Sequence, residues 1–473
     1  MTQKVTKVDV VVVGAGPAGV IAGAYLAKGG INTVVFEKTG NVGGPKWGMH
    51  QISEGFMSDN FLHLPYWDWH LNNGRGGWVK AAQELGAPIK WQCLPAAAIY
   101  PQALGRIINV PYCSCGRAVV DFFSELMPLS DESKHEMARI ADQALNMPLE
   151  DIWSEKAQTT TFGDWLRERT SDDMVKSSFA MIAGIMVAMP TDVALDKCNV
   201  SYMVSTVFRF MLGGWSVFNQ VVGGVQNAIP AAFGKVITEH DGRILTNHSV
   251  QRVIIEDGVA KGVIVKNDKG DEEIYEADYV VLAASYPPIR KFLGKHLPDE
   301  IHRTLEVWER DHDYVLDVHF ALKRQFINPP GQTPMLIVLD EGGMLRGYIS
   351  FPSNFEPSYA PPGKQQVYAE KNLTAEEHKK GKDYWVAEMM NMCEDVFPGF
   401  KDEIEAFSVH EINPFGTNYW LPAKKVPLEC PGVARLYFAG DYVKGEGNGT
   451  ELAASTGTIV ARRILVRENK AVC

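Results

Sequence analysis

The chain opens with an apolar run that leads directly into a glycine-rich turn. Residues 8–13 are valines apart from one aspartate, a pattern typical of a strand buried on both faces of a parallel sheet. The turn at 14–19 is followed by a helical pattern over 20–28, which Gly29-Gly30 would end. A second apolar run fills 33–36. Together these patterns predict a β-α-β unit.

A second strand-rich region lies past the middle of the chain. Residues 250–256 and 259–266 flank Asp257-Gly258, a dipeptide that favours a two-residue hairpin turn. A third strand near 273–276 would complete a meander. A separate buried strand is expected over 279–283.

The intervening segments have weaker periodicity. Residues 51–120 are rich in aromatics, glycine and proline, whereas 121–220 indicate helices with capped starts at Ser130 and Thr161. Residues 290–410 mix strands and helices. The chain then closes with a strand over 435–439, a glycine-rich loop and a helix from about 450 to 466.

Length and charge narrow the class of protein. A chain of 473 residues is too long for one ordinary core, which predicts two domains. The net charge of −11 gives an acidic surface that repels phosphate backbones, so nucleic acid is excluded as a partner. The same sign disfavours electrostatic docking on anionic lipid.

Cysteine usage and hydropathy indicate an intracellular protein. Seven cysteines, an odd number, do not form a secreted disulfide framework. Cys113-Ser114-Cys115 lacks a second pair at metal spacing, so we expect ordinary thiols and no metal. The longest apolar stretch, 179–190, is too short to span a bilayer and suits a buried helix or a membrane-dipping patch. Without a signal-peptide pattern, we expect a cytoplasmic location, with peripheral membrane contact left open.

The first turn has the spacing of a dinucleotide-binding loop. Gly14 permits the tight turn out of the strand, Gly16 lets the backbone approach a pyrophosphate, and Gly19 allows close packing of helix and strand. Pro17 suits the first helical turn and Ala18 follows it. Free N–H groups and the helix dipole would then face the phosphates.

An acidic residue stands where the second strand ends. Glu37, next to Lys38, lies 18 positions after Gly19. Its carboxylate can accept hydrogen bonds from both ribose hydroxyls and would repel a 2′-phosphate, which favours FAD or NAD over NADP.

Gly43-Gly44, followed by the basic residue Lys46, resembles a signature of the flavoprotein amine oxidases and phytoene desaturases. The segment 55–63 is similar to that superfamily's next strand, with Phe61 in place of a usual glycine. Gly223-Gly224 and the strand starting at Val250, whose backbone would contact adenine, continue the resemblance.

The closing segment carries the most specific match. Residues 438–441, 445–451 and 455–457 follow the superfamily's C-terminal signature. The resemblance implies that Asp441 binds ribityl hydroxyls and that Gly447 lets the loop pass close to the flavin. The implied FAD contacts are Gly14, Gly16, Pro17, Ala18, Gly19, Glu37, Lys38, Gly43, Gly44, Lys46, Val250, Gly440, Asp441, Gly449, Thr450, Glu451 and Leu452.

The resemblance implies an α/β fold with a discontinuous Rossmann-type FAD-binding domain and an inserted α+β substrate domain. The expected FAD domain comprises 1–63, 221–290 and 410–473, and the substrate domain 64–220 and 291–409. The segment 415–419 holds no cysteine for a covalent flavin bond, so non-covalent FAD is expected. No second G-x-G-x-x-G follows a strand, which predicts no NAD(P)H domain and reoxidation by oxygen, a quinone or another acceptor.

Two enzymatic functions and one non-enzymatic function remain open. The first is hydride transfer between flavin N5 and a carbon of an apolar or cyclic small molecule, in desaturation, saturation or isomerisation. The second is oxidation of an amine, for which Tyr419-Trp420 could supply part of an aromatic cage. The third is a flavin-bound scaffold.

A side chain must handle the proton that accompanies hydride transfer. The candidates are His63, Tyr442, Glu446 and Tyr419. The apolar segment 179–218 could line a substrate tunnel or form a helical core, and the aromatic segment 65–70 could wall the pocket or pack as a cluster.

Overall fold

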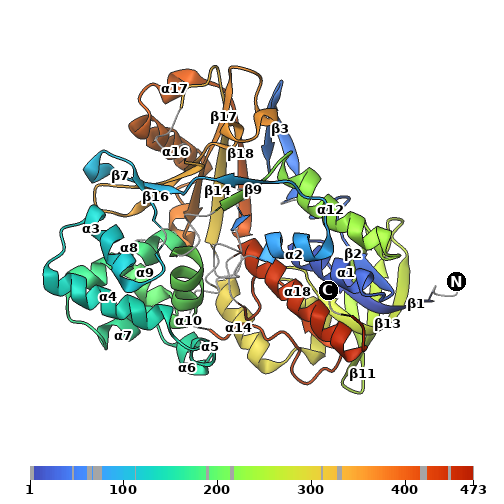
Figure 1. The fold of residues 1–473 in the computed structure, drawn as a ribbon. Helices are drawn as coiled ribbons and strands as arrows, with labels where there is room; N and C mark the ends of the chain where they lie inside the picture. Colours follow the sequence, from blue (N-terminus) through green and yellow to red (C-terminus); the bar gives the residue numbers. More distant parts are fainter. Residues whose placement is uncertain are drawn as a thin grey trace.

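The computed structural model contains two seven-stranded sheets and a helical region (Figure 1). The residues that it describes are 5–44, 47–60, 66–67, 77–111, 113–187, 191–212, 218–310, 313–327, 333–415, 423–445 and 449–471.

The first sheet has the strand order β10-β2-β1-β13-β12-β11, with β19 beside β13. β10, β2, β1, β13 and β19 run parallel, and β11 and β12 form the predicted hairpin on β13. The bounds are β1 (Val5–Val13), β2 (Thr33–Phe36), β10 (Arg243–Leu245), β11 (Ser249–Glu256), β12 (Val259–Lys266), β13 (Glu272–Leu282) and β19 (Leu436–Phe438).

β13 joins two strands that the sequence pattern separates. Its first half pairs antiparallel with β12, and its second half pairs parallel with β19, while β1 runs beside nearly its whole length. The meander strand expected near 273–276 and the buried strand expected over 279–283 are therefore one strand. The polar residues between them interrupt the apolar pattern without interrupting the backbone pairing.

Four helices cover one face of the first sheet: α1 (Pro17–Lys28), α2 (Gly77–Leu85), α12 (Val225–Glu239) and α18 (Gly449–Arg467). α1 and α18 approach so closely that a Cβ on Gly457 would lie 2.4 Å from the Ala18 carbonyl oxygen. Where they meet α2, Tyr25 donates to Glu84, and Arg462 donates to the same carboxylate at 2.8 Å. Three helices therefore share one partly buried polar contact.

The second sheet has the order β18-β14-β17-β16-β15-β7-β8, antiparallel except for β15 and β7. α16 (Lys382–Val396) packs on its apolar face. The strands are β7 (Ala98–Pro101), β8 (Ile108–Asn109), β14 (Asp313–Leu322), β15 (Met335–Leu339), β16 (Leu345–Ser350), β17 (Gln365–Leu373) and β18 (Ile404–Phe415).

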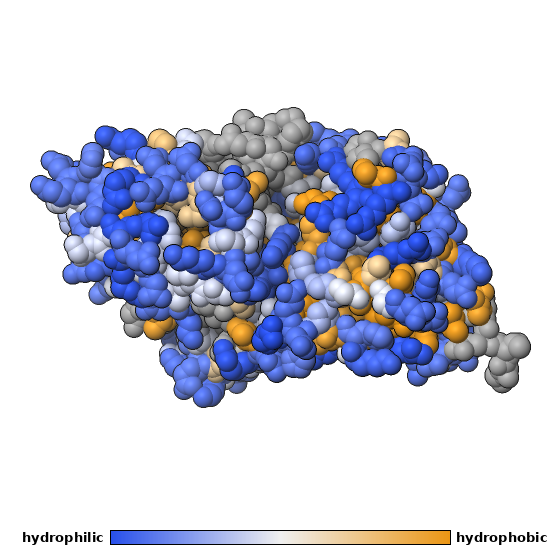
Figure 2. All heavy atoms as spheres, turned by 90° about the horizontal axis from the view of Figure 1, so that it is seen from below, coloured by the Kyte–Doolittle hydropathy of each residue, from blue (hydrophilic) through white to orange (hydrophobic). Residues whose placement is uncertain are grey.

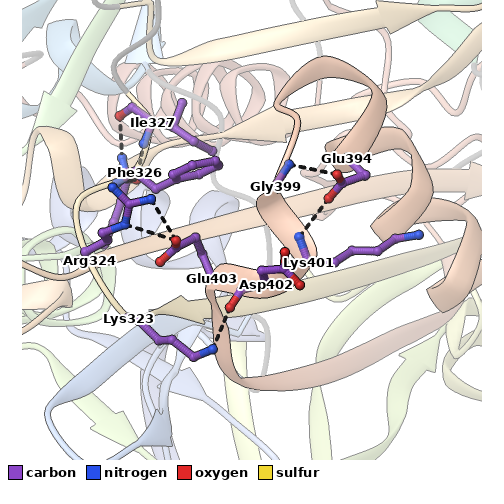
Figure 3. Close-up of polar contacts among 10 residues, drawn as sticks. Lys323, Arg324, Phe326, Ile327, Glu394, Gly399, Lys401, Asp402 and Glu403 are labelled. Atoms are coloured by element: carbon purple, nitrogen blue, oxygen red, sulfur yellow. Dashed lines mark hydrogen bonds and ion pairs between the residues drawn. The ribbon is translucent and has the colours of Figure 1, made fainter.

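Polar contacts fix the turn that joins α16 to β18 through α17 (Phe400–Glu403) (Figure 3). Glu394 accepts from the backbone N–H of Gly399 at 2.7 Å and of Lys401 at 2.9 Å. Arg324, just after β14, donates to Glu403 at 2.8 and 3.0 Å. These contacts lie next to the start of β18, where Ile404 pairs with Leu322 of β14.

The helical region packs around an aromatic core. The predicted caps are confirmed: Ser130 accepts from Ser133 N–H, and Thr161 from Asp164 N–H. The Phe179 ring is fully buried and contacts other rings of this region, so the apolar side chains there form helical core. The elements are α3 (Gly116–Leu126), α4 (Asp131–Leu145), α5 (Leu149–Ile152), α6 (Glu155–Thr159), α7 (Phe162–Arg167), α8 (Asp173–Val187), α9 (Thr191–Lys197), α10 (Val200–Tyr202) and the π-helix η3 (Met203–Met211).

Smaller elements connect these parts. The hairpin of β3 (Met49–Ser53) and β4 (Phe56–Asp59) lies against the second sheet, and β9 pairs with both β5 and β6. The remaining elements are β5 (Tyr66–Trp67), β6 (Trp91–Leu94), β9 (Phe218–Val221), α13 (Ile289–Leu293), α14 (Asp299–Arg310), α15 (Ala375–His378) and the 3-10 turns η2 (Gln102–Leu104), η4 (Gly294–His296), η6 (Pro352–Asn354) and η7 (Pro357–Tyr359).

Two observations bear on the expected domain limits. β18 runs through residue 410, so that limit falls inside a strand of the second sheet. α2 packs with α1 and α18, although its residues fall in the expected substrate segment.

The surface is mostly hydrophilic. In Figure 2, hydrophilic residues cover much of the face seen from below and separate its apolar areas. Among the described helices, none is long and apolar enough to cross a membrane.

We expect Gly457→Ala to destabilise the protein by about 1–3 kcal/mol, because the new methyl group would force the α18 backbone away from Ala18. Thermal unfolding measures this. Thr458→Ala, the adjacent change at a half-buried position, is the control and should cost less. Equal effects of the two substitutions would contradict the close packing of α1 and α18.

Candidate functional site

Three parallel strands end in register at one edge of the first sheet. Val13 lies beside Leu282, and Leu282 lies beside Phe438. Two backbone hydrogen bonds extend the alignment by one residue, Ala283 N–H to Val13 O and Ala439 N–H to Leu282 O, both 2.9 Å. The turns that leave β1 and β19 are therefore neighbours, although the sequence separates them by more than 400 residues.

The first turn has the geometry that its glycines predict. Gly14 has φ +102°, and a Cβ on it would lie 3.0 Å from the Ala283 carbonyl oxygen. A Cβ on Gly19 would lie 1.8 Å from the Gly14 oxygen, so the helix starts in contact with the turn. A Cβ on Gly16 would meet no atom within 4 Å. Gly14 and Gly19 are thus required by the fold, whereas Gly16 keeps the N-terminus of α1 open to a ligand.

Glu37 reaches back from the end of β2 to this turn. The residue is 7% exposed, and its carboxylate accepts from Ala15 N–H at 3.1 Å and from the Thr39 N–H and hydroxyl at 2.9 and 2.8 Å. These bonds fix the Glu37 side chain beside the glycine turn. Lys38 is exposed.

The Gly43-Gly44 segment is attached to the same turn. Gly43 donates its N–H to Ala15 O at 2.8 Å, and both glycines have positive φ, +94° and +70°. Such φ values favour glycine, so the pair lets the chain fold back over the turn. The predicted basic neighbour, Lys46, lies outside the described residues.

The C-terminal loop is anchored by Thr456. Its buried hydroxyl accepts from Gly440 N–H at 3.0 Å and lies 3.1 Å from Gly440 O, which ties the end of β19 to α18. Asp441 is half-buried beside it. Gly449 begins α18 with φ +48°, and a Cβ there would meet nothing within 4 Å. Thr450 follows at a half-buried position, and Leu452 is buried in the helix.

Glu451 has a structural contact that the sequence does not reveal. Its side chain is 1% exposed and accepts from Gly77 N–H at 2.5 Å and Trp78 N–H at 3.2 Å. The carboxylate therefore caps the start of α2. Its backbone N–H remains the group expected to face the flavin pyrimidine edge.

Lys425 is a site residue that sequence reasoning missed. It is 5% exposed, its ammonium lies 5.4 Å from the Trp153 ring centre, and its backbone N–H donates to Gln158. Burial lowers the pKa of Lys425 to about 7, and the charge of Asp441 opposes that shift. The sequence around Lys425 contains other lysines and prolines, and no motif in it distinguishes this residue.

The candidate proton-handling residues are only partly accounted for. Tyr442 is fully buried, its hydroxyl donates to Leu282 O at 3.2 Å, and burial raises the pKa of the phenol. This placement favours packing over proton transfer. His63, Tyr419 and Glu446 lie outside the described residues.

The structure also places Val250 and the Cys113-Ser114-Cys115 pair of thiols. Val250 is buried in β11 opposite Val265. Burial raises the pKa of the Cys113 thiol to about 12, and Cys115 is exposed. In the described part of the chain, no three His, Cys, Asp or Glu side chains form a metal-binding group.

The residues fit a dinucleotide with its pyrophosphate at the start of α1. Three features lie at one edge of the parallel sheet: the open Gly16, the fixed Glu37 carboxylate and the adjacent Gly440–Asp441 loop. At this edge the chain leaves β1 toward β2 on one side, while β13 lies on the other side of β1. This arrangement defines a Rossmann-type dinucleotide-binding protein.

The chain belongs to the family of flavin-containing amine oxidoreductases, whose family model matches residues 72–465. It is therefore a flavin-dependent oxidoreductase that uses a small-molecule substrate and an electron acceptor, and the predicted superfamily and fold class are confirmed. The model of a second family, Thi4, matches residues 1–58, the part that contains the β-α-β unit.

Two relatives are similar over long stretches. A limonene dehydrogenase polypeptide of Castellaniella defragrans is 24% identical over 76% of this chain and 72% of its own length. Prolycopene isomerase 2 of an Oncidium hybrid cultivar is 23% identical over 52% of this chain and 46% of that protein.

Solved structures share the fold. An oxidoreductase from Methanosarcina mazei superposes with a TM-score of 0.70 at 20% identity, covering 96% of this chain and 99% of that one. Cyclohexylamine oxidase from Brevibacterium oxydans gives 0.67 at 15% identity, covering 97% and 99%.

We expect stability to rise with pH between about pH 7 and about pH 10.5, the folded and unfolded pKa values of Lys425. In that window the unfolded chain holds a proton that the folded chain has lost, so the slope from this group approaches about 1.4 kcal/mol per pH unit. Urea denaturation across the window measures it. Lys425→Met should remove this slope, and Lys424→Met, at the half-exposed neighbour paired with Glu155, should keep it. A slope that survives Lys425→Met would contradict the assignment.

Proposed function

We propose that the protein is an FAD-dependent oxidoreductase that transfers hydride between flavin N5 and a carbon of an apolar or cyclic small molecule, in desaturation, saturation or isomerisation. The observation that carries the proposal is the alignment of the Gly14 turn, Glu37 and the Gly440–Asp441 loop at one sheet edge. The family match supports a flavin, and the names of the two relatives, a limonene dehydrogenase and a prolycopene isomerase, support hydrocarbon substrates.

FAD is favoured over shorter flavins because the β-α-β unit supplies an adenosine site. N–H groups at the start of α1, next to Gly16, would hold the pyrophosphate, and Glu37 would accept from the adenosine ribose hydroxyls. Asp441 would accept from the ribityl chain. When bound, the flavin supplies the two-electron redox step, and backbone N–H groups at the start of α18 would stabilise the negative charge of its reduced form.

The domain division belongs to the same proposal. The FAD-binding part comprises 1–63, 221–290 and 410–473, and the substrate part comprises 64–220 and 291–409, except that residues 410–415 continue β18 of the second sheet. The packing of α2 on α1 and α18 suggests that residues 77–85 support the cofactor side of this division.

Amine oxidation is the second candidate, and the description of the matching family favours it. The two candidates differ in the group that donates the electrons, a carbon–carbon unit or a carbon–nitrogen unit. They share the cofactor site, so only substrates separate them.

Flavin uptake can be separated from folding by two substitutions in one turn. Gly16→Val fills open space at an ordinary φ, so we expect an unchanged melting temperature of the cofactor-free protein and FAD affinity weakened by about a hundredfold, roughly 2.7 kcal/mol. Gly19→Val places carbon against the Gly14 oxygen and should prevent folding. Calorimetry and visible absorbance measure both effects. Normal FAD uptake by Gly16→Val would overturn the proposed site. Acid denaturation of the wild type should release all of the yellow colour if the FAD is non-covalent.

Anaerobic bleaching tests the reaction class. We expect a cyclic alkene such as limonene to bleach the flavin of the purified protein, and cyclohexylamine to leave it yellow. Bleaching by cyclohexylamine alone would establish the amine oxidase alternative. If neither compound bleaches the flavin and stoichiometric NADPH reduces it rapidly, the expectation that the protein has no NAD(P)H domain would be contradicted.

A further inference from the structure

One face of the second sheet is lined by polar side chains arranged in cross-strand rows. Asp317 on β14 lies directly beside Glu370 on β17, with His410 and Tyr348 next in the row on β18 and β16. The adjacent row, two residues along each strand, is Ser408, His319, Tyr368 and Ser350. Because side chains alternate across a strand, all of these residues project from the same face.

The opposite face of the same strands is apolar. Leu316, Val318 and Phe320 of β14 alternate with the polar residues and pack with α16 in a separate core. The polar face is nevertheless buried, since Asp317 and His319 are 0% exposed and Glu370 is 7% exposed. A sheet with polar side chains buried on one face is unusual, because such groups cost free energy unless a partner satisfies them.

Two buried polar atoms on this face have no protein partner among the described residues. They are His319 Nε2 and Gln366 Oε1, whereas Glu370 is hydrogen-bonded to Asp317. Nearly all buried polar atoms in proteins are hydrogen-bonded, so these two call for a partner from outside the protein, either water or a ligand.

The His319 proton can be assigned from its neighbours. Gln366 Nε2 donates to Ser58 Oγ at 3.0 Å, which leaves the Ser58 hydroxyl to donate to His319 Nδ1. Burial and the nearby histidines His50 and His410 lower the pKa of His319 well below its usual range. The neutral ring therefore carries its proton on Nε2, the nitrogen without a described partner.

Two elements bound the polar face. The β3–β4 hairpin, which supplies Ser58, follows the Gly43-Gly44 segment in the chain and covers one end of the face. At the other end, Tyr348 donates to Ile185 O of α8 at 2.6 Å. Asp317 and Glu370 lie between these two boundaries.

The charge state of the carboxyl pair follows from burial and proximity. Burial, followed by the charge of Asp317 and a hydrogen bond to it, raises the pKa of Glu370 well above its usual range. Two adjacent buried carboxyls cannot both ionise at neutral pH, so the pair holds one proton and one negative charge. The other titratable groups that face the pair or its row are Asp59, Tyr359, Tyr368, Tyr348, His50, His319 and His410.

We propose that Asp317 and Glu370 share one proton and form the acid–base pair that handles the substrate proton in the hydride-transfer reaction. This inference rests on the proposed function. In the oxidative direction, a substrate C–H beside the hydride-donating carbon breaks, its electron pair forms the new double bond, and its proton goes to the singly charged pair, which becomes neutral. The flavin, when bound, would supply the acceptor for the hydride and its two electrons. In the reverse direction, the pair returns that proton to carbon.

The kinetic test uses Glu370→Gln and Asp317→Asn, which keep the shape of the side chains and remove the shared proton. The control is Glu405→Gln, at a carboxyl paired with Lys364 on the same sheet. With limonene as reductant, we expect both variants to bind FAD normally and to reduce it about 10²–10⁴-fold more slowly, with kcat lowered and KM little changed. In both variants the pH–rate profile should lack one limb of the wild-type profile. Glu405→Gln should behave as wild type.

Other outcomes decide against the pair. Wild-type rates and an unchanged pH profile in both variants would overturn the inference and leave the proposed function intact. A raised KM with unchanged kcat would also overturn it, because the pair would then only bind substrate. A wild-type protein that takes up no flavin would instead defeat the proposed function.

Infrared spectroscopy tests the shared proton without any substrate. The wild-type holoenzyme at neutral pH should show the C=O absorption of a protonated carboxyl, and Glu370→Gln should lack it. This measurement also applies if Asp317→Asn fails to fold. Identical carboxyl absorption in the wild type and Glu370→Gln would overturn the inference.

Discussion

The structure depends on the register that aligns the ends of β1, β13 and β19. Parallel pairing places Val13, Leu282 and Phe438 side by side, so the turns that follow them open at a common edge. The helix dipole and free N–H groups of α1 point to that edge, and the Glu37 carboxylate is held there by three hydrogen bonds. β13 also pairs with β12, so one strand contacts both the meander and the strand that leads into the first glycine turn. The contact of Gly14 with Ala283 depends on the pairing of β1 with β13.

In the second sheet, the alternation of side chains separates an apolar face from a polar face. Its apolar face, with Leu316, Val318 and Phe320, buries hydrocarbon against α16, which stabilises the sheet. The stability gained on that side can offset the cost of burying Asp317 and Glu370 on the other. Functional sites commonly keep such unfavourable groups where the surrounding fold is rigid enough to hold them. Here the rigidity comes from direct pairing of β14 with both β17 and β18.

The sequence allowed much of the first sheet to be predicted and little of the second. The β-α-β unit, the 250–266 hairpin and the closing strand and helix each carry a local signal, namely glycine spacing, a turn dipeptide or an apolar run. The length of β13 was missed because its pairing partners are distant in sequence. The alternation of Asp317 and His319 with apolar residues was visible, but which face met the rest of the protein depended on the packing of α16 and the β3–β4 hairpin. Lys425 and the Glu451 cap depend on contacts with Trp153 and Gly77, which no local pattern encodes.

The β3–β4 hairpin lies between the glycine turns and the second sheet in the order of the chain, and it packs on the second sheet. β3 begins at Met49, six residues after Gly43, whose N–H is bonded to Ala15 in the first turn, and β4 carries Ser58, which is bonded to His319 on the second sheet. The backbone hydrogen bonds of an antiparallel hairpin hold both of its strands in place. The hairpin therefore holds Ser58, and with it the His319 tautomer, at the polar face that also carries Asp317 and Glu370.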